Sequence, residues 1–187
     1  MKTLNNYIGK NMKKLLITAA GALALITNVA NADPKPLGLE IGKATISDFE
    51  QKFPQATYID NNLYTSGRMY SLNSREVALE GLQKDVVFIF NRDESLAGVL
   101  MTFNKDKFNE LNGQLKKKYK KVIKSVIPFV GNKLVKYKDG NSVVELNAPH
   151  LSFEMELSYL SNSFIKTMNA QIQKNENAKK QQESELL

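Results

Sequence analysis

The sequence lacks cysteine and contains a single histidine, His150, among its 187 residues. Disulfide stabilisation is therefore excluded. A lipid-modified N-terminus is excluded too, because it needs a cysteine just after the export signal. With one histidine and no cysteine we expect neither a transition-metal site nor a cofactor. The sequence also contains no phosphate-binding loop, dinucleotide fingerprint or nucleophile elbow.

Long apolar runs are scarce. The one near the N-terminus, residues 15–26, follows a lysine-containing stretch and is shorter than the roughly 20 residues that a membrane span needs. Small residues then follow at Ala30-Asn31-Ala32. A basic stretch, a short apolar run and small residues in this order are typical of a signal peptide. We therefore interpret residues 1–32 as a signal peptide and expect no transmembrane span after it.

Cleavage between Ala32 and Asp33 would leave a mature chain of 155 residues in the periplasm or secreted medium. Either Met1 or Met12 can be the start, because a basic stretch follows both.

Four of the 26 basic residues and none of the 19 acidic ones leave with the signal, so the net charge falls from +7 to +3. That modest charge does not favour nucleic acid as a partner. A chain of this length buries roughly 68–70% of its unfolded surface, enough for one core.

Residues 132–160 have the clearest strand pattern, with a hairpin signal at Asp139-Gly140 between two alternating segments. In the last segment, apolar and polar residues alternate, which predicts a strand with one buried face. Its apolar residues are Leu151, Phe153, Met155, Leu157 and Tyr159. On the polar face we expect Glu145, Glu154 and Glu156 to be cross-strand partners of Lys136 and Lys138. The stretch is thus predicted to be an antiparallel meander.

Three helices are predicted. Thr45 and Asp48 form a capping-box pair at the start of the first, which Pro54 ends. The second begins at Asn104 or Asp106, and the third covers residues 161–175. Residues 176–187 lack apolar spacing and are predicted to be a disordered polar tail.

Further strands are predicted at residues 86–90, 96–103 and 122–127, with one or two short strands in 63–72. Residues Asp60-Asn61-Asn62 are interpreted as a loop. The fold class is therefore α+β, an antiparallel sheet covered by helices. Helix and strand patterns repeat, which predicts two tandem helix-plus-meander units, about 39–103 and 104–160, in one domain over 33–175. The predicted core is Phe49, Phe53, Phe88, Phe90, Met101, Phe103, Leu111, Leu115, Phe153, Met155, Leu157 and Phe164.

The leader Leu39-Glu40-Ile41-Gly42-Lys43-Ala44-Thr45, followed by a helix and a meander, resembles the repeats of beta-lactamase-inhibitor-like proteins. SmpA-type outer-membrane assembly lipoproteins are similar. The resemblance covers roughly residues 39–159 as two units. It implies an exported module that binds other proteins and lacks catalysis. The missing lipidated cysteine departs from the lipoproteins, so membrane anchoring is not implied.

Lysine is concentrated in one stretch. Residues 105–138 contain eleven lysines and two acidic residues, a net charge of +9, while residues 33–104 and 139–187 each carry −3. A solvated helix end explains such a run, because lysines favour the last helical turn. A functional alternative is a surface for an anionic ligand or partner. Its residues would be Lys116, Lys117, Lys120, Lys121 and Lys124. Strand alternation after Tyr119 predicts that Lys121 and Lys124 point to opposite faces.

The leading interpretation is an exported, non-enzymatic binding module of the bacterial envelope that contacts a protein or an anionic envelope component. One alternative is an envelope-acting hydrolase in which His150 works with a nearby carboxylate such as Glu154. Another is an inhibitor or immunity protein for a secreted enzyme. The sequence identifies no catalytic residue with a recognised motif.

The signal-peptide interpretation predicts the N-terminus of the exported protein. Intact-mass spectrometry of the protein in the soluble envelope fraction should give the mass of a chain that begins at Asp33. A chain in that fraction that still begins at Met1 or Met12 would show that residues 1–32 are not removed.

Overall fold

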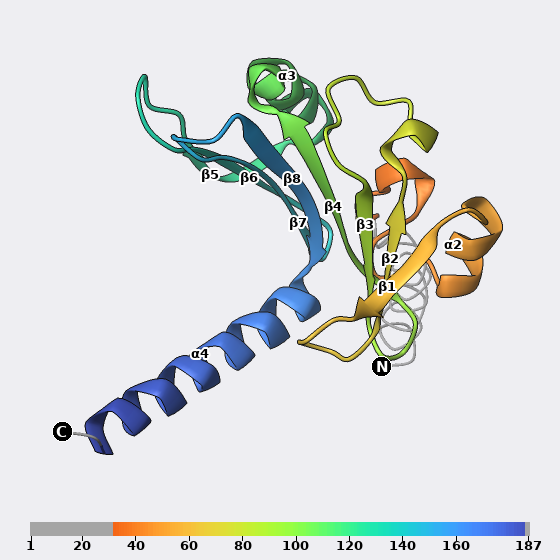
Figure 1. The fold of residues 1–187 in the computed structure, drawn as a ribbon. Helices are drawn as coiled ribbons and strands as arrows, with labels where there is room; N and C mark the ends of the chain where they lie inside the picture. The colour runs from red at the N-terminus through yellow and green to blue at the C-terminus, as the bar shows by residue number, and fades with distance from the viewer. Residues whose placement is uncertain (1–31, 186–187) are drawn as a thin grey trace, which may run out of the picture. The chain divides into compact units, whose positions relative to one another are not determined.

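The computed structural model describes residues 32–185, so the predicted signal peptide lies outside the described residues except for Ala32. Eight antiparallel strands form one sheet in the order β1-β2-β3-β4-β8-β7-β6-β5 (Figure 1). The strands are β1 (Thr57–Asn61), β2 (Arg68–Leu72), β3 (Val86–Phe90), β4 (Leu96–Asn104), β5 (Lys121–Val126), β6 (Lys133–Asp139), β7 (Ser142–Ala148) and β8 (Glu154–Ser161). The helices of this part are α2 (Ile46–Lys52), α3 (Phe108–Lys118) and α4 (Asn162–Glu185), with 3-10 turns η1 (Pro36–Gly38), η2 (Ser74–Glu76) and η3 (Lys105–Lys107). No helix within residues 32–185 is long and apolar enough to cross a membrane.

The chain passes twice through the same succession of elements. Helix α2 precedes the meander β1–β4, and α3 precedes the meander β5–β8. The two meanders join where β4 pairs with β8, from Gly98↔Leu160 to Asn104↔Glu154. The last strand of each unit is therefore central, and the first strand of each lies at an outer edge. The predicted α+β fold with two helix-plus-meander units is confirmed.

The first helix begins as its sequence predicts. Thr45 Oγ1 accepts a hydrogen bond from the Asp48 amide at 3.2 Å, and the Thr45 amide donates to Asp48 Oδ2 at 2.8 Å. This capping box fixes the helix start, which brings Phe49 onto the sheet. The Phe49 ring is fully buried and lies 4.6 Å from that of Phe88 and 5.5 Å from that of Phe90, measured between centroids. One helical turn thereby anchors α2 to β3.

The main core lies on one face of the sheet, under α2 and α3. Directly paired residues of β4 and β8 share this face: Val99 with Tyr159, Met101 with Leu157, and Phe103 with Met155. Most of the predicted core is buried here. Phe53 and Leu111 are partly buried and pack against the margin of the core. Helix α3 contributes Phe108 and Leu115 as its buried residues. The apolar alternation seen in the sequence therefore does mark the covered face.

Phe153 is a correction to that core. Its side chain is 92% exposed and that of Leu151 is 94% exposed, because β8 begins at Glu154. The preceding residues belong to a turn after Pro149, and the Phe153 carbonyl accepts a hydrogen bond from the Lys105 amide at 2.8 Å. Alternation of residue types continues through residues 151–153, but the backbone there is no strand, so alternation placed the start of the strand too early.

Two further segments differ from expectation. Residues 57–61, partly interpreted as a loop, form strand β1, whose five residues are all exposed and therefore show no apolar alternation. Helix α4 continues to Glu185, beyond the predicted end at Asn175. Its last two turns contain no glycine or proline, and Lys179 pairs with Glu183 one turn away at 3.8 Å. Helix propensity and this i,i+4 pair stabilise the exposed stretch.

The other face of the sheet has a small second cluster and a polar region. Phe164 of α4 packs on Ile89 and Ala97, after Ser161 Oγ caps the helix by accepting from the Phe164 amide at 3.2 Å. Farther along the sheet, Lys136 pairs with Glu145 of the neighbouring strand at 2.5 Å, as predicted. The same prediction is wrong for Glu154 and Glu156, because β8 does not neighbour β6, and Glu154 pairs with Lys84. This face is therefore exposed to solvent over β6 and β7 and covered by apolar packing near α4.

Two phenylalanines test the corrected start of β8. Phe103 is 1% exposed and Phe153 is 92% exposed. Replacing Phe103 with alanine should lower the free energy of unfolding by about 3–5 kcal/mol, because it leaves a cavity in the core. Phe153→Ala should change it by less than about 0.5 kcal/mol. Urea unfolding of both variants measures the difference, and similar losses in the two would mean that Phe153 is packed.

Candidate functional site

Helix α3 ends in three exposed lysines, Lys116, Lys117 and Lys118. The flanking residues Leu115 and Tyr119 are buried, so the helix keeps its apolar side on the sheet while the lysines extend into solvent. Positive charge in a last turn stabilises the helix through its macrodipole. The position on a helix end therefore accounts for these three lysines without any ligand.

The chain places further lysines next to that helix end. A depression of about 480 Å³ is lined by Lys118, Lys120, Lys121, Lys138, Asp139 and Gly140. Strand pairing brings Lys121 of β5 directly opposite Lys138 of β6. We call these four lysines the lysine hollow. A helix end explains Lys118 alone among them, so the convergence needs a different reason.

The lysine hollow overlaps the predicted site in part. Lys120 and Lys121 belong to it, whereas Lys116, Lys117 and Lys124 lie outside its lining. The other two residues of the hollow, Lys118 and Lys138, were not predicted from the sequence. Lys138 is seventeen positions beyond Lys121 and reaches the site through the β5–β6 pairing. Lys118 belongs to the run of lysines at the end of α3, and nothing in the sequence distinguishes it from Lys116 and Lys117. A hairpin register for β5 and β6 would have found Lys138.

A register shift in β5 overturns the predicted orientation of its lysines. The regular pairing breaks between Val122 and Lys124, so Lys121 lies opposite Lys138 and Lys124 lies opposite Lys136. Directly opposed residues share a face, and Lys136 and Lys138 are two positions apart on one strand. Lys121 and Lys124 therefore share a face. The β-bulge concentrates positive charge on one side, although like charges directly opposite one another are destabilising.

Asp139 lines the lysine hollow, but no lysine of the hollow forms a close ion pair within the described residues. Within residues 32–185, none of its four ammonium groups lies within 4.0 Å of a carboxylate oxygen. Lys118 Nζ instead lies 5.3 Å from the centroid of the Tyr119 ring. Burial and, second, the nearby Asp33 raise the pKa of Asp139, while Lys118 opposes that rise. The hollow is thus a place where an added anion gains favourable charge contacts.

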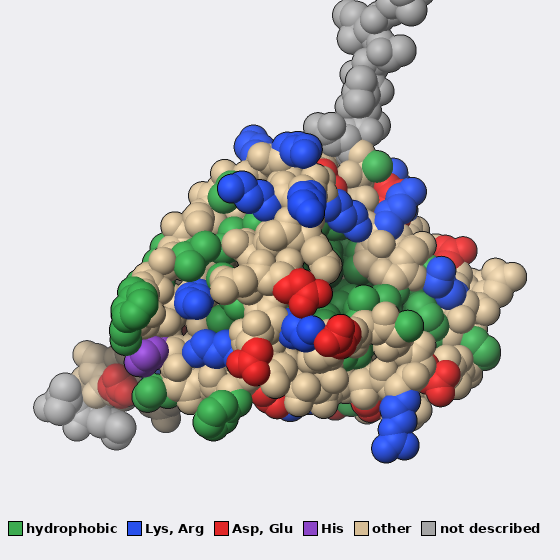
Figure 2. All heavy atoms as spheres, turned by 90° about the horizontal axis from the view of Figure 1, so that it is seen from above, with side chains coloured by type: hydrophobic (Ala, Val, Ile, Leu, Met, Phe, Trp, Pro, Cys, Tyr) green, Lys and Arg blue, Asp and Glu red, His purple; other side chains and the backbone are tan. Residues whose placement is uncertain are grey.

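Apolar side chains are exposed along the same edge strand and in the loop that follows it. Val122, Ile123 and Val126 of the edge strand β5 are each close to half exposed, and Phe129 in the following loop is fully exposed. Figure 2 looks onto this end of the sheet and shows Lys and Arg side chains gathered along one side of it. Lysines on an edge strand also hinder edge-to-edge aggregation, which is a structural reason for some of this charge.

Tyr119 connects the helix end to the core. Its side chain is 2% exposed, and within the described residues its hydroxyl is buried without a hydrogen-bond partner. Its ring packs between those of Tyr137 and Tyr159, with centroids 6.1 and 6.4 Å away. Burial, followed by the influence of Tyr159, raises the pKa of Tyr119. Packing of the Tyr119 ring therefore fixes the end of α3. Burial of its unpaired hydroxyl lowers the stability that this packing provides.

The predicted hydrolase pair is not brought together. The His150 amide donates to Asn132 Oδ1 at 2.7 Å, and its side chain is exposed in the turn before β8. The Glu154 carboxylate pairs with Lys84 Nζ at 2.5 Å, and no hydrogen bond joins Glu154 to His150 in the described structure. In the same residues no group of three or more histidine, aspartate or glutamate side chains could hold a metal ion.

No family model and no curated protein matches this chain. Among solved structures it is similar to the crystal structure of a DUF4309 family protein, YjgB, from Bacillus subtilis. The two share 14% identity with a TM-score of 0.38, over 71% of this chain and 88% of that chain. A likeness of this size assigns neither a family nor a function.

Two tyrosines provide a matched test of the packing under the helix end. Tyr119→Phe removes an unpaired buried hydroxyl and should leave the free energy of unfolding unchanged or raise it slightly. Tyr137→Phe removes a hydroxyl that donates to Asn112 Oδ1 at 2.7 Å and should lower it by about 0.5–1.5 kcal/mol. Urea unfolding at neutral pH measures both, and a loss in Tyr119→Phe that equals the loss in Tyr137→Phe would show that Tyr119 is paired.

Tyr119→Phe should also change how the stability of the protein depends on pH in alkali. Because burial raises the pKa of Tyr119 in the folded protein, the folded state holds a proton that the unfolded chain releases above about pH 10. Stability should therefore fall as the pH rises through that range. In Tyr119→Phe the fall between neutral pH and about pH 11 should be smaller than in the parent.

Proposed function

We propose that this protein is an exported binding module that contacts an anionic component of the bacterial envelope through the lysine hollow. The observation that supports the proposal is the convergence of four lysines, without paired carboxylates in the described structure, from a helix end and two adjacent strands. Exposed lysines that serve solubility alone need not converge. Opposed lysines on neighbouring strands cost stability, and an anionic ligand would offset that cost.

The charge distribution makes such binding local. Residues 105–138 carry +9, and the flanking parts of the mature chain carry −3 each. At physiological ionic strength exposed charges act over about 8 Å, so the acidic parts do not cancel the lysine hollow at contact distance. Binding that depends on this hollow should be strong at low salt and weak at high salt.

The proposed location follows from the N-terminal sequence. A signal peptide over residues 1–32 would place the mature chain in the periplasm or outside the cell. Anionic lipids and glycans are abundant surfaces in that setting. Support for binding without catalysis comes from the hydrolase candidates, since Glu154 is paired with Lys84 and not with His150.

Removing charge from the hollow tests the proposal. Lys120, Lys121 and Lys138 should be replaced together by glutamine, and binding to vesicles of phosphatidylglycerol and phosphatidylethanolamine measured by co-sedimentation across a salt series. Each lysine near an anionic surface contributes about 1 kcal/mol, so the triple variant should bind about 100-fold more weakly at low salt. The difference should shrink as salt is added.

A matched control removes the same charge elsewhere. Lys166, Lys174 and Lys180 are exposed on α4, outside the hollow, and their replacement by glutamine should leave vesicle binding within about two-fold of the parent. Neither triple variant should lose folding stability, because exposed charges contribute little. If the hollow variant binds as the parent does at every salt concentration, the lysines are a solvated helix end and hairpin.

A further inference from the structure

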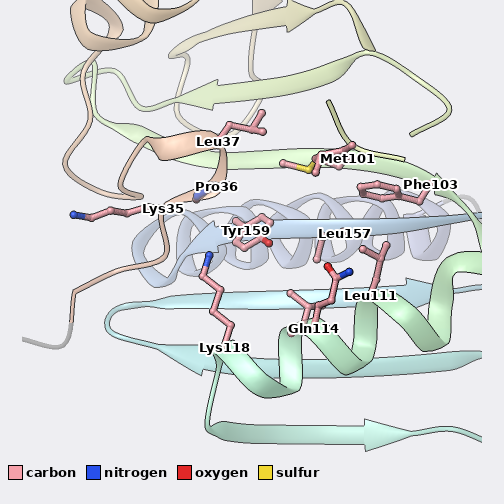
Figure 3. Close-up of a pocket in the computed structure, with 12 residues that line it drawn as sticks. Lys35, Pro36, Leu37, Met101, Phe103, Leu111, Gln114, Lys118, Leu157 and Tyr159 are labelled. Carbon is pink, nitrogen blue, oxygen red and sulfur yellow. The ribbon is translucent and has the colours of Figure 1, made fainter. Parts of the chain in front are cut away.

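A second cavity adjoins the lysine hollow on the covered face of the sheet. Its volume is about 210 Å³, and its floor is formed by Met101 and Phe103 of β4 and Leu157 of β8 (Figure 3). Leu111 and other residues of α3 form one wall, and η1 forms the other. The pocket thus lies at the junction of the two units. An apolar floor with few polar groups at the rim is the usual character of a small-molecule site.

The wall opposite α3 is fixed in place. Pro34 and Pro36 are buried, and the Ile41 amide donates to the Pro34 carbonyl at 3.0 Å. Leu37, which lines the pocket, has φ of 50°, a left-handed conformation that is unfavourable for a leucine. Such strain persists where the surrounding structure enforces it and is frequent at ligand clamps. The pocket is therefore formed before any ligand arrives.

The two cationic groups of the pocket differ in their availability. Lys35 Nζ is 2.9 Å from a carboxylate oxygen of Glu40, which Lys43 also contacts. Both lysines hold the pKa of Glu40 at about 2, Lys43 more strongly, so that pair is ionised at neutral pH. Lys118, in contrast, has no carboxylate within 4.0 Å among the described residues. In Figure 3 its side chain reaches from α3 toward Pro36 and Tyr159, at one end of the pocket.

Lys118 belongs to both cavities. It lines the apolar pocket together with Leu157 and the lysine hollow together with Lys120. A ligand that occupies the pocket and ends at Lys118 must therefore be apolar along its length and anionic at its end. Charge complementarity at Lys118 and the apolar floor select the same class of molecule.

We propose that the pocket binds the alkyl chain of a single-chain anionic amphiphile, with its carboxylate or phosphate headgroup at Lys118. This inference rests on the proposed function and narrows it, because it identifies a monomeric amphiphile as ligand in addition to an anionic surface. The pocket is smaller than the roughly 300–1,000 Å³ typical of drug-sized ligands. It has room for part of one alkyl chain, and a two-chain phospholipid exceeds it.

Calorimetric titration with three probes below their micelle concentrations tests the inference. Dodecyl phosphate has both the chain and the charge, butyl phosphate keeps the charge with a short chain, and dodecyl maltoside keeps the chain without charge. We expect the purified protein to bind dodecyl phosphate with one-to-one stoichiometry. The other two probes should bind at least about ten-fold more weakly, because each lacks one of the two contacts.

Two variants test where the alkyl chain and the headgroup of the ligand bind. Gln114 lines the pocket but is exposed on α3, so Gln114→Trp should fill the pocket without disturbing the core and should weaken dodecyl phosphate binding at least about ten-fold. Lys118→Gln should weaken dodecyl phosphate to the level of dodecyl maltoside. Gln173→Trp, at an exposed glutamine of α4, adds the same side chain elsewhere and should bind as the parent does. Thermal unfolding of each variant verifies folding.

The outcomes separate this inference from the proposed function. Dodecyl phosphate that binds equally well to the parent and to folded Gln114→Trp overturns the pocket assignment, and so does a lack of one-to-one binding. Equal affinity for dodecyl maltoside overturns the headgroup assignment to Lys118. Neither result affects the vesicle experiment, in which Lys118 and Gln114 are unchanged. If vesicle binding does not depend on Lys120, Lys121 and Lys138 but the pocket variants lose dodecyl phosphate, the proposed surface is wrong and the pocket stands.

Discussion

The rest of the structure depends on the pairing between β4 and β8, which joins the two meanders into one sheet. Seven successive residue pairs join the two meanders along these strands, and the paired side chains Met101 with Leu157 and Phe103 with Met155 form the middle of the core. Both strands are the last of their unit, so the junction joins the two units through their final strands. The antiparallel ladder then makes one continuous sheet from two halves that each leave a strand edge open.

The candidate site is a consequence of that junction. Helices α2 and α3 each cover their own unit, and the space between them over β4 and β8 is closed in part by η1. The remaining space is the apolar pocket, whose floor is the paired strands themselves. In the second unit, α3 ends at Lys118, close to the first residue of β5 and the last residues of β6. Lys118 therefore lines both the pocket and the lysine hollow. The proposed ligand follows from this adjacency of an apolar cavity and concentrated positive charge.

Sequence patterns predicted the elements whose burial follows a simple period. The capping residues Thr45 and Asp48, the doubly covered strand β3 and the alternation in β8 all have local signatures. The exposed strand β1 has none, because neither of its faces is buried. Phe153 was misassigned since residue alternation does not report where backbone pairing begins.

The candidate site was predicted less completely than the fold. The run of lysines after Leu115 is visible in the sequence, and it identified Lys120 and Lys121. Lys138 joins them through strand register, and the β-bulge after Val122 reverses the expected orientation of Lys124. The pocket depends on contacts between η1, α3 and two distant strands. Such long-range packing leaves no periodic trace in a single sequence.

Methionine methyl groups provide the most direct measurement of the central claim, that an anionic amphiphile binds between α3 and η1. Met101 lines the pocket, whereas Met69 and Met168 lie in the second cluster on the opposite face. In a titration of methyl-labelled protein with dodecyl phosphate, the account predicts that the Met101 resonance shifts and saturates while those of Met69 and Met168 remain in place. Saturable shifts of Met69 and Met168 without a shift of Met101 would contradict it.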